Sequence, residues 1–240
     1  PVRWRLLVHF VAAVWVIALV GGAPALPLPG VSWDWGWFGT VVLVLFIAWL
    51  LNLYNFMDGI DGMAGVEAIT VAGPAAAILW SSGAAGWATV AALLAAASLG
   101  FLGWNWPPAK IFMGDAGSGF IGFMLAALAV LAWADADLSI WAWLILLGVF
   151  IVDATITLVR RVVRGERFYE AHRSHAYQHA SRYYDRHLPV TVAVGVINLL
   201  WLTPLAVIAA LLPAWGIVLL VLAWAPLLLV CLRFHAGLPD

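Results

Sequence analysis

Amide and carboxylate side chains recur at every third position in the segment NLYNFMDGIDGMAG, residues 52–65. The series consists of Asn52, Asn55, Asp58 and Asp61. Residues three apart on a helix lie on adjoining faces, so this spacing directs several oxygen ligands towards one region. A loop of turn-forming Asn, Asp and Gly is the alternative explanation. It suits Asn52 and Asn55 poorly, because an amide in an apolar span is costly unless it faces a polar site. We expect Asp58 and Asp61 to be functional and leave both explanations open for the two Asn.

A second polar segment, NWPPAKIFMGDAGS, covers residues 105–118. Lys110 and Asp115 are its charged residues. Asp115 precedes an apolar run, where it could cap a helix or stand beside the free N–H groups of the helix start. Capping explains a single Asp but not the nearby Lys110. A carboxylate for a divalent cation beside an ammonium for phosphate is a common pairing in phosphoryl transfer.

A third segment, residues 160–187, is strongly basic and contains seven Arg and four of the six His. Attraction to anionic lipid headgroups explains its first Arg residues well; these are Arg160, Arg161 and Arg164. The compact sequence HRSH, with His172, Arg173 and His175, is better suited to an anionic ligand that contains a ring. Arg binds phosphate in a bidentate manner, and imidazole offers stacking and directional hydrogen bonds. A zinc site at the two His is the alternative, although no Cys is near.

Asp153 lies inside an apolar run, about two turns before Arg160. An ionisable residue in such a position is a functional candidate by default. Pairing with an Arg of the basic segment, in a structural role, explains it equally well. Both interpretations stay open from the sequence.

The composition shows which kind of molecule positions these segments. Of 240 residues, 65% are hydrophobic and 10% charged, with a mean hydropathy of +1.03. A soluble domain carries about 25% charged residues, so lipid must solvate most of this surface. Many of the sixteen Trp stand at the ends of apolar runs, as in an interfacial aromatic belt. The single Cys231 excludes an intrachain disulfide framework and a Cys-based zinc site.

About eight apolar segments are long enough to cross a bilayer, and they predict an all-α, polytopic transmembrane bundle that forms one domain over residues 1–240. They cover residues 6–21, 38–56, 67–81, 87–104, 118–133, 138–159, 190–211 and 214–232. The third is short and contains Gly73 and Pro74, which predicts a kink or a tilt.

The loops between these segments predict an orientation. All eleven Lys and Arg fall on one side when the segments alternate in direction, and the opposite loops hold Asp34, Asp135 and Asp137. By the positive-inside rule the basic side is cytoplasmic. All three polar segments lie on that side, which indicates one site built from three loops.

These motifs resemble those of the bacterial polyprenyl-phosphate N-acetylhexosamine-1-phosphate transferases, the MraY and WecA superfamily of glycosyltransferase family 4. The likeness is closest to the O-antigen-initiating branch typified by WbpL. Asn55, Asp58 and Asp61 match the family signature N-x-x-D-G-x-D-G-L-A, with Met63 where Leu is usual.

The other two segments match further family motifs in the same order. The run from Asn105 through Lys110 to Asp115 matches N-x-x-P-A-x-x-F-M-G-D, whose Asp is a magnesium ligand in the family. The sequence HRSH, residues 172–175, resembles the branch motif HRxH, which is associated with the nucleotide sugar.

The resemblance implies a set of roles. Asp58, Asp61 and Asp115 are expected to be catalytic, with Asp115 as the metal ligand. The expected substrate-binding residues are Asn55, Asn105, Lys110, His172, Arg173 and His175. The expected ion is Mg²⁺, with Mn²⁺ as the alternative.

The resemblance also implies partners and a location. The expected substrates are a UDP-N-acetylhexosamine and undecaprenyl phosphate, and the products are undecaprenyl-diphosphate-sugar and UMP. We expect a multi-pass protein of the bacterial inner membrane, with the active site on the cytoplasmic side and no nucleic-acid partner. Family members are often dimers, so a homodimer is one of the oligomeric states that stay open. Direct attack and a covalent intermediate both remain open.

One departure concerns the N-terminal end. The family carries an Asp-Asp pair just upstream of a segment that resembles Arg3–Leu7, and here the chain begins at Pro1. Family members typically have ten or eleven spans, so we expect an N-terminally truncated chain that lacks about three spans. Two other function classes stay open: a transporter that uses the same carboxylates, and a non-catalytic membrane subunit.

Overall fold

The structure is a computed structural model that describes residues 2–136, 138–166 and 172–239. Pro1, Asp137 and Arg167, the last being one of the seven Arg of the basic segment, lie outside these residues. The helices are α1 (Val2–Val20), α2 (Gly36–Met57), α3 (Met63–Ser81), α4 (Ala85–Asn105), α5 (Gly114–Ala136), α6 (Ile140–Leu146), α7 (Gly148–Val163), α8 (Ala176–Tyr184), α9 (Leu188–Ile197), the π-helix η1 (Asn198–Leu202), α10 (Thr203–Leu211), the 3₁₀-helix η2 (Pro213–Trp215) and α11 (Gly216–Arg233).

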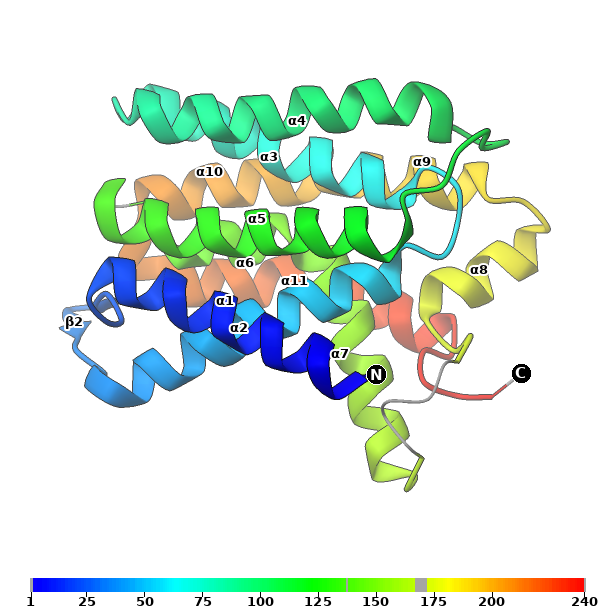
Figure 1. Ribbon diagram of the computed structural model, residues 1–240, viewed down its shortest axis with the longest axis horizontal. Coiled ribbons are helices and arrows are strands. Elements are labelled where there is room, and N and C mark those ends of the chain that lie inside the picture. Colours follow the sequence, from blue (N-terminus) through cyan, green and yellow to red (C-terminus); the bar gives the residue numbers. More distant parts are fainter. Residues whose placement is uncertain (1, 137, 167–171, 240) are drawn as a thin grey trace.

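The described chain forms a bundle of long apolar helices, which confirms the predicted all-α, polytopic fold class (Figure 1). Its only strands, β1 (Leu26–Leu28) and β2 (Val31–Trp33), form an antiparallel hairpin between α1 and α2. The hairpin lies at one end of the bundle, opposite the end where both chain termini lie.

The predicted spans all lie in helices, but they are not equivalent. Six are long and apolar enough to cross a membrane: α2, α3, α4, α5, the continuous α9–η1–α10 and η2–α11. The pair α6 and α7 would be a seventh, and the apolar helix Trp4–Val20 is shorter than the others. The prediction of about eight spans therefore corresponds to six full-length spans, one broken span and one shorter helix.

Two predicted spans differ in detail from the structure. The segment predicted at 67–81 begins earlier, at Met63, and continues through Pro74 as one helix. The segment predicted as one span at 138–159 is broken after Leu146, and α6 and α7 meet at an angle of 76°. The sequence on both sides of the break, residues 140–152, contains no charged residue, so hydropathy alone could not show the break.

Helices α3 and α5 form the centre of the bundle. Of the most apolar stretch of 18 residues in each helix, 72% is buried in α3 and 61% in α5. Small side chains such as Ala64, Ala68 and Ala72 on α3 allow neighbouring helices to approach closely. The outer helices α1, α4 and α11 instead expose many large apolar side chains, as expected of surfaces that face lipid.

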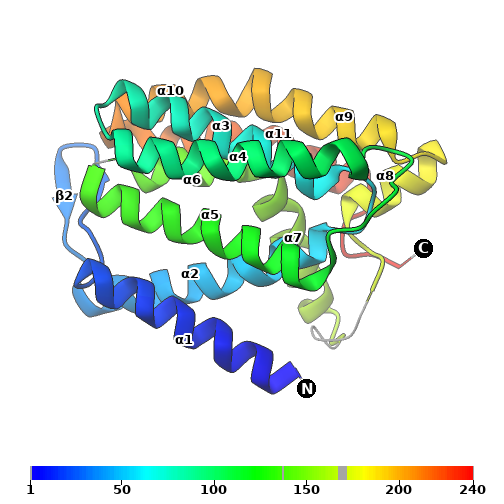
Figure 2. The same cartoon turned by 45° about the horizontal axis from the view of Figure 1, so that its top comes forward.

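The three polar segments gather at the end of the bundle that is opposite the hairpin (Figures 1 and 2). The α2–α3 loop, the α4–α5 loop and the segment that leads into α8 all lie there. The antiparallel succession of long helices thus assembles one polar end from loops far apart in the sequence.

Candidate functional site

Asn105 joins the first two polar loops. Its Oδ1 accepts the N–H of Gly62 at 2.9 Å, and its Nδ2 donates to the carbonyl of Ile111 at 2.8 Å. The side chain is buried at the C-terminal end of α4. The structure therefore gives Asn105, predicted to bind substrate, contacts that hold the two loops together.

Asp61 is bound mainly to the surrounding loops. Its Oδ2 accepts the N–H of Ala109 at 3.0 Å and lies 3.3 Å from Nδ1 of His187. Its carbonyl accepts the hydroxyl of Thr191 at 2.7 Å. Asp61, which was predicted to be catalytic, thus fixes its loop to α9 and to the α4–α5 connection.

Asp115 is the exposed carboxylate of the site, in the first turn of α5. Nδ2 of Asn55 donates to its Oδ1 at 3.1 Å and also to Oγ of Ser118 at 2.9 Å. Nη1 of Arg5 donates to its Oδ2 at 3.0 Å. The predicted residues Asn55 and Asp115 therefore meet directly, and Arg5 from α1 adds a cation that sequence reasoning had not assigned to the site.

Asp58 directly follows Met57, the last residue of α2. Burial and then the negative charge of Asp115 raise the pKa of Asp58 to about 7. The negative charge of Asp115 thus disfavours the ionised form of Asp58 by repulsion. A cation between substrate and protein would relieve this repulsion.

Asn52 has different neighbours from Asn55. Its Nδ2 donates to the carbonyl of Ala48 at 2.7 Å and lies 3.1 Å from Nδ1 of His9 on α1. The polar side chains at every third position therefore do not share one environment, because Asn52 contacts α1 whereas Asn55 contacts Asp115.

Lys110 is exposed, and its ammonium lies 5.5 Å from the ring centre of Trp104, a cation–π distance. Its backbone N–H donates to the carbonyl of Trp104 at 2.8 Å, which folds the loop back on the end of α4. The ammonium stays at the polar end of the bundle, where it could meet an anion.

The HRSH segment is anchored by Asp153 of α7. The Asp153 carboxylate accepts the N–H groups of Ala176 at 2.9 Å and Tyr177 at 3.0 Å, and the hydroxyl of Thr157 at 3.1 Å. Its Oδ1 lies 3.3 Å from Nδ1 of His175. Asp153 therefore has a structural role, but its partners are His175 and the start of α8 rather than an Arg.

The three predicted residues of HRSH lie in different environments. His175 is buried and its ring stacks on His172, with centroids 4.9 Å apart. Nδ1 of His172 lies 3.0 Å from the hydroxyl of Ser174. Arg173 is exposed, and its carbonyl accepts Nη2 of Arg182. The exposed Arg173 and half-buried His172 are thus the members that a ligand can reach.

Tyr177 connects HRSH to the carboxylate loop, a link that sequence reasoning missed. Its hydroxyl donates to the carbonyl of Phe56 at 3.0 Å, and its ring stacks on His175. Burial and then the charges of Asp153 and Asp58 raise its pKa, so the hydroxyl keeps its proton. A Cβ at Gly59 would collide with this hydroxyl. In the sequence, Gly59 was the residue that could have indicated such a close approach of another side chain to the loop.

We expect Asp153→Asn to loosen α8. The amide oxygen of Asn can replace one carboxylate oxygen, but the amide nitrogen cannot accept a hydrogen bond in place of the other. A hydrogen bond to a buried charged group contributes about 2 kcal/mol. Hydrogen–deuterium exchange of the α8 amides should then become about 30-fold faster. Thr157→Val removes a single donor and is the matched control, with a smaller expected effect. Unchanged exchange in Asp153→Asn would contradict the anchoring role.

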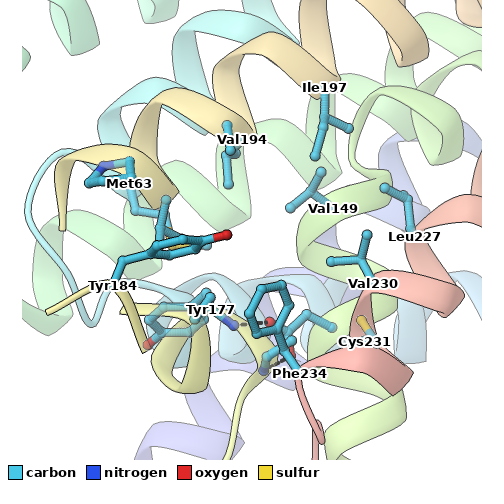
Figure 3. Close-up of a pocket in the computed structure, with 16 residues that line it drawn as sticks. Met63, Val149, Tyr177, Tyr184, Val194, Ile197, Leu227, Val230, Cys231 and Phe234 are labelled. Carbon is cyan, nitrogen blue, oxygen red and sulfur yellow. Dashed lines mark hydrogen bonds between the residues drawn. The ribbon is translucent and has the colours of Figure 1, made fainter. Parts of the chain in front are cut away.

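An apolar cavity of about 460 Å³ lies beneath α8, between α7, α9 and α11. Figure 3 shows Tyr177, Tyr184 and Phe234 on one side and aliphatic side chains such as Val149 and Val194 on the other. Met63, at the end of the carboxylate loop, also lines it. An apolar space thus adjoins the polar end of the bundle.

Comparison with known proteins points to one family. Residues 1–133 match the family described as Glycosyl transferase family 4. A probable undecaprenyl-phosphate N-acetylglucosaminyl 1-phosphate transferase of Bacillus subtilis (strain 168) is 34% identical over 142 residues, which are 58% of this chain and 40% of the relative.

A second relative has a different sugar substrate in its name. The phospho-N-acetylmuramoyl-pentapeptide-transferase of Halalkalibacterium halodurans is 33% identical over 171 residues, 69% of this chain and 50% of the relative. The chain therefore spans about half the length, or less, of these two relatives.

Proposed function

The chain belongs to glycosyl transferase family 4, and we propose on that premise that it transfers N-acetylhexosamine-1-phosphate from a UDP-sugar to undecaprenyl phosphate. The products are undecaprenyl-diphosphate-sugar and UMP. The observation that carries the proposal is the hydrogen bond from Asn55 to Asp115, which joins the end of α2 to the start of α5 at the polar end of the bundle. The names of the two relatives support transfer of a phospho-sugar to a lipid phosphate.

The donor set is compatible with Mg²⁺ as the cofactor, and with Mn²⁺ as the alternative. In the described part of the chain, no group of three His, Cys, Asp or Glu side chains is placed to hold a metal ion. Mg²⁺ is commonly bound through one or two carboxylates together with substrate phosphates and water. Asp115, whose charge also acts on Asp58, fits that mode. The ion would supply charge neutralisation at the diphosphate of the donor.

The residues of the chain would bind and orient the two substrates. Lys110 and Arg173 are exposed cations at this end of the bundle and would balance phosphate charge. Asp61 and Asn105 would hold the loops in register. An oxygen of the lipid phosphate, already anionic near neutral pH, forms a bond to the phosphorus that carries the sugar. The bond from this phosphorus to the UMP oxygen breaks, and UMP leaves.

A site shared by a lipid and a soluble nucleotide needs both polar and apolar surfaces. The carboxylate loops supply the first, and the cavity beneath α8 supplies apolar surface next to them. The positive-inside rule favours the cytoplasmic face of a bacterial inner membrane for this end. The HRSH motif favours the O-antigen-initiating branch, and the oligomeric state, a homodimer among the alternatives, stays open.

Mg²⁺-dependent release of UMP tests the function. The protein expressed from its complete native coding sequence, purified into nanodiscs, should release UMP from UDP-N-acetylhexosamines when undecaprenyl phosphate is present. EDTA should abolish the release, and added Mg²⁺ should restore it. Folded protein without release for any of several UDP-sugars would refute the transferase and favour transport or a non-catalytic role.

A further inference from the structure

The chain turns back directly after α11, at the polar end of the bundle. His235 has a φ of +55°, in the left-handed region. The N–H of Ala236 donates to the carbonyl of Cys231 at 2.9 Å, and the N–H of His235 donates to that of Leu232 at 3.2 Å. These two bonds form a Schellman motif, in which a helix end satisfies its last carbonyls and reverses the chain. The segment 234–238 is thereby placed next to the start of α8 (Figures 1 and 2).

Gly237 joins this segment to HRSH. Its N–H donates to the carbonyl of Ser174, the third residue of HRSH, at 2.7 Å. Gly237 has a φ of +77°. A Cβ at this position would lie 2.7 Å from the Cβ of Arg160 and 3.0 Å from the carbonyl oxygen of Thr157, both on α7. The backbone conformation and the close approach both require glycine. Gly237 therefore lies against α7 while it binds HRSH.

Arg160 of α7 holds the neighbouring residue of the same segment. Its Nη1 donates to the carbonyl of Ala236 at 2.9 Å, and Ala236 is fully buried. From the sequence, attraction to lipid headgroups explained Arg160 well, but in the structure its guanidinium binds a carbonyl of the chain. A hydrogen bond from a charged donor is stronger than one between neutral groups. The end of α7 is therefore bound to the segment 234–238 by a side chain as well as by close packing.

The segment 234–238 also contacts α8. Nε2 of His179 lies 3.2 Å from the carbonyl oxygen of Leu238, and Nδ1 of the same ring lies 3.1 Å from Nη2 of Arg182. A guanidinium can only donate, so Nδ1 accepts, and Nε2 carries the ring proton that it donates to Leu238. Nη2 of Arg182 also donates to the carbonyl of Arg173 at 3.0 Å. Two successive carbonyls of HRSH, those of Arg173 and Ser174, are therefore held by one network.

We propose that the segment 234–238 positions HRSH for the nucleotide sugar, with Gly237 and Arg160 as positioning residues. Asp153 fixes the end of HRSH that leads into α8. Gly237 instead fixes the carbonyl that follows the exposed Arg173. A backbone that is fixed before a ligand binds lowers the entropic cost of binding. Only the kinetic consequence of this arrangement rests on the proposed function.

Gly237→Ala tests the geometry without an assay of activity. Hydrogen–deuterium exchange of peptides that cover residues 172–180 and 234–239 should become about tenfold faster, because the new Cβ separates the segment from α7 and breaks its hydrogen bonds. Gly165→Ala is the matched control. Gly165 follows α7 with a φ of +75°, but nothing lies within 4 Å of a Cβ there. Equal acceleration in both variants would assign the effect to backbone strain and overturn the proposal.

Arg160→Leu removes the bond to Ala236 without straining the backbone. Arg164→Leu is its matched control, because Arg164 belongs to the same basic segment and pairs with Glu166. Each variant removes one positive charge at the end of α7, so weaker attraction to lipid headgroups would affect both equally. We expect exchange of the same peptides to become about fivefold faster in Arg160→Leu and to stay within about twofold of wild type in Arg164→Leu.

Kinetics of the protein expressed from its complete native coding sequence test the consequence. The KM for the UDP-sugar should rise about tenfold in Gly237→Ala and about fivefold in Arg160→Leu, with kcat and the KM for the lipid phosphate within about twofold of wild type. A purely structural defect would lower the amount of folded enzyme without changing the donor KM of the remainder. Both control variants should keep the wild-type donor KM.

The outcomes separate this proposal from the proposed function. Unchanged exchange in both Gly237→Ala and Arg160→Leu would overturn the binding of the segment to HRSH, and faster exchange with an unchanged donor KM would overturn the positioning role. If Gly237→Ala does not fold, Arg160→Leu and its control Arg164→Leu decide the question alone. If the wild-type protein releases no UMP, the transferase proposal fails, while the exchange rates still decide whether the segment holds HRSH.

Discussion

Asp115→Asn is expected to reduce the turnover of UMP release at least ~100-fold, a loss comparable to that of a preorganised electrostatic contact in other enzymes. The substitution keeps the shape of the side chain and an oxygen that can accept the hydrogen bond from Asn55. It removes the negative charge that would hold a divalent cation at the diphosphate. Initial rates at saturating UDP-sugar and lipid phosphate, measured at several Mg²⁺ concentrations, provide the measurement.

Asp135→Asn is the matched control for this loss. Asp135 is also exposed, but it lies at the hairpin end of the bundle, where it accepts the indole N–H of Trp87 at 2.7 Å. Its substitution should leave turnover close to wild type. Turnover of Asp115→Asn within a few-fold of wild type would remove Asp115 from the mechanism.

Gly59→Ala is expected to lower turnover about 100-fold, because a displacement of about 1 Å near reacting groups can have this effect. The new Cβ would collide with the hydroxyl of Tyr177. Either the carboxylate loop or the start of α8 must then move, and Asp58 and HRSH lose their mutual placement.

Tyr177→Phe supplies the control in the form of a rescue. Alone, it removes the hydrogen bond to Phe56 and should cause a smaller loss of turnover. Combined with Gly59→Ala, it removes the atom that collides with the new methyl group. The double variant should therefore be more active than Gly59→Ala alone. A double variant no more active than Gly59→Ala would show that the Tyr177 hydroxyl does not cause the defect.

The sequence alone could predict the class of the fold and the gathering of the three polar segments at one end of the bundle. Its low charge and long apolar segments require a lipid-solvated helical bundle, and alternation of the loops places all three polar segments together. The contact of Asn55 with Asp115 follows from the same arrangement. These predictions rest on composition and on the direction of each span, which local sequence determines.

Other features depend on contacts that no local pattern records. The site residues Asp61 and Asn105 have mainly structural partners, because loops from different helices reach their polar atoms first. His175, just before α8, is buried beside Asp153 of α7. The break after Leu146 occurs without a proline and within uniformly apolar sequence. Tertiary packing, rather than local preference, decides each of these.

The hairpin between α1 and α2 covers the end of the bundle that is farthest from the polar loops. The indole of Trp141 donates to the carbonyl of Pro27, and that of Trp35 to the carbonyl of Pro24, so the hairpin and its approach are bound to the helix ends. The two ends of the bundle therefore differ, because the polar loops gather at one end and the bound hairpin lies at the other. Under the proposed function, the lipid-linked sugar would form at the loop end, in the leaflet that this end faces, and its passage across the bilayer would be a separate step.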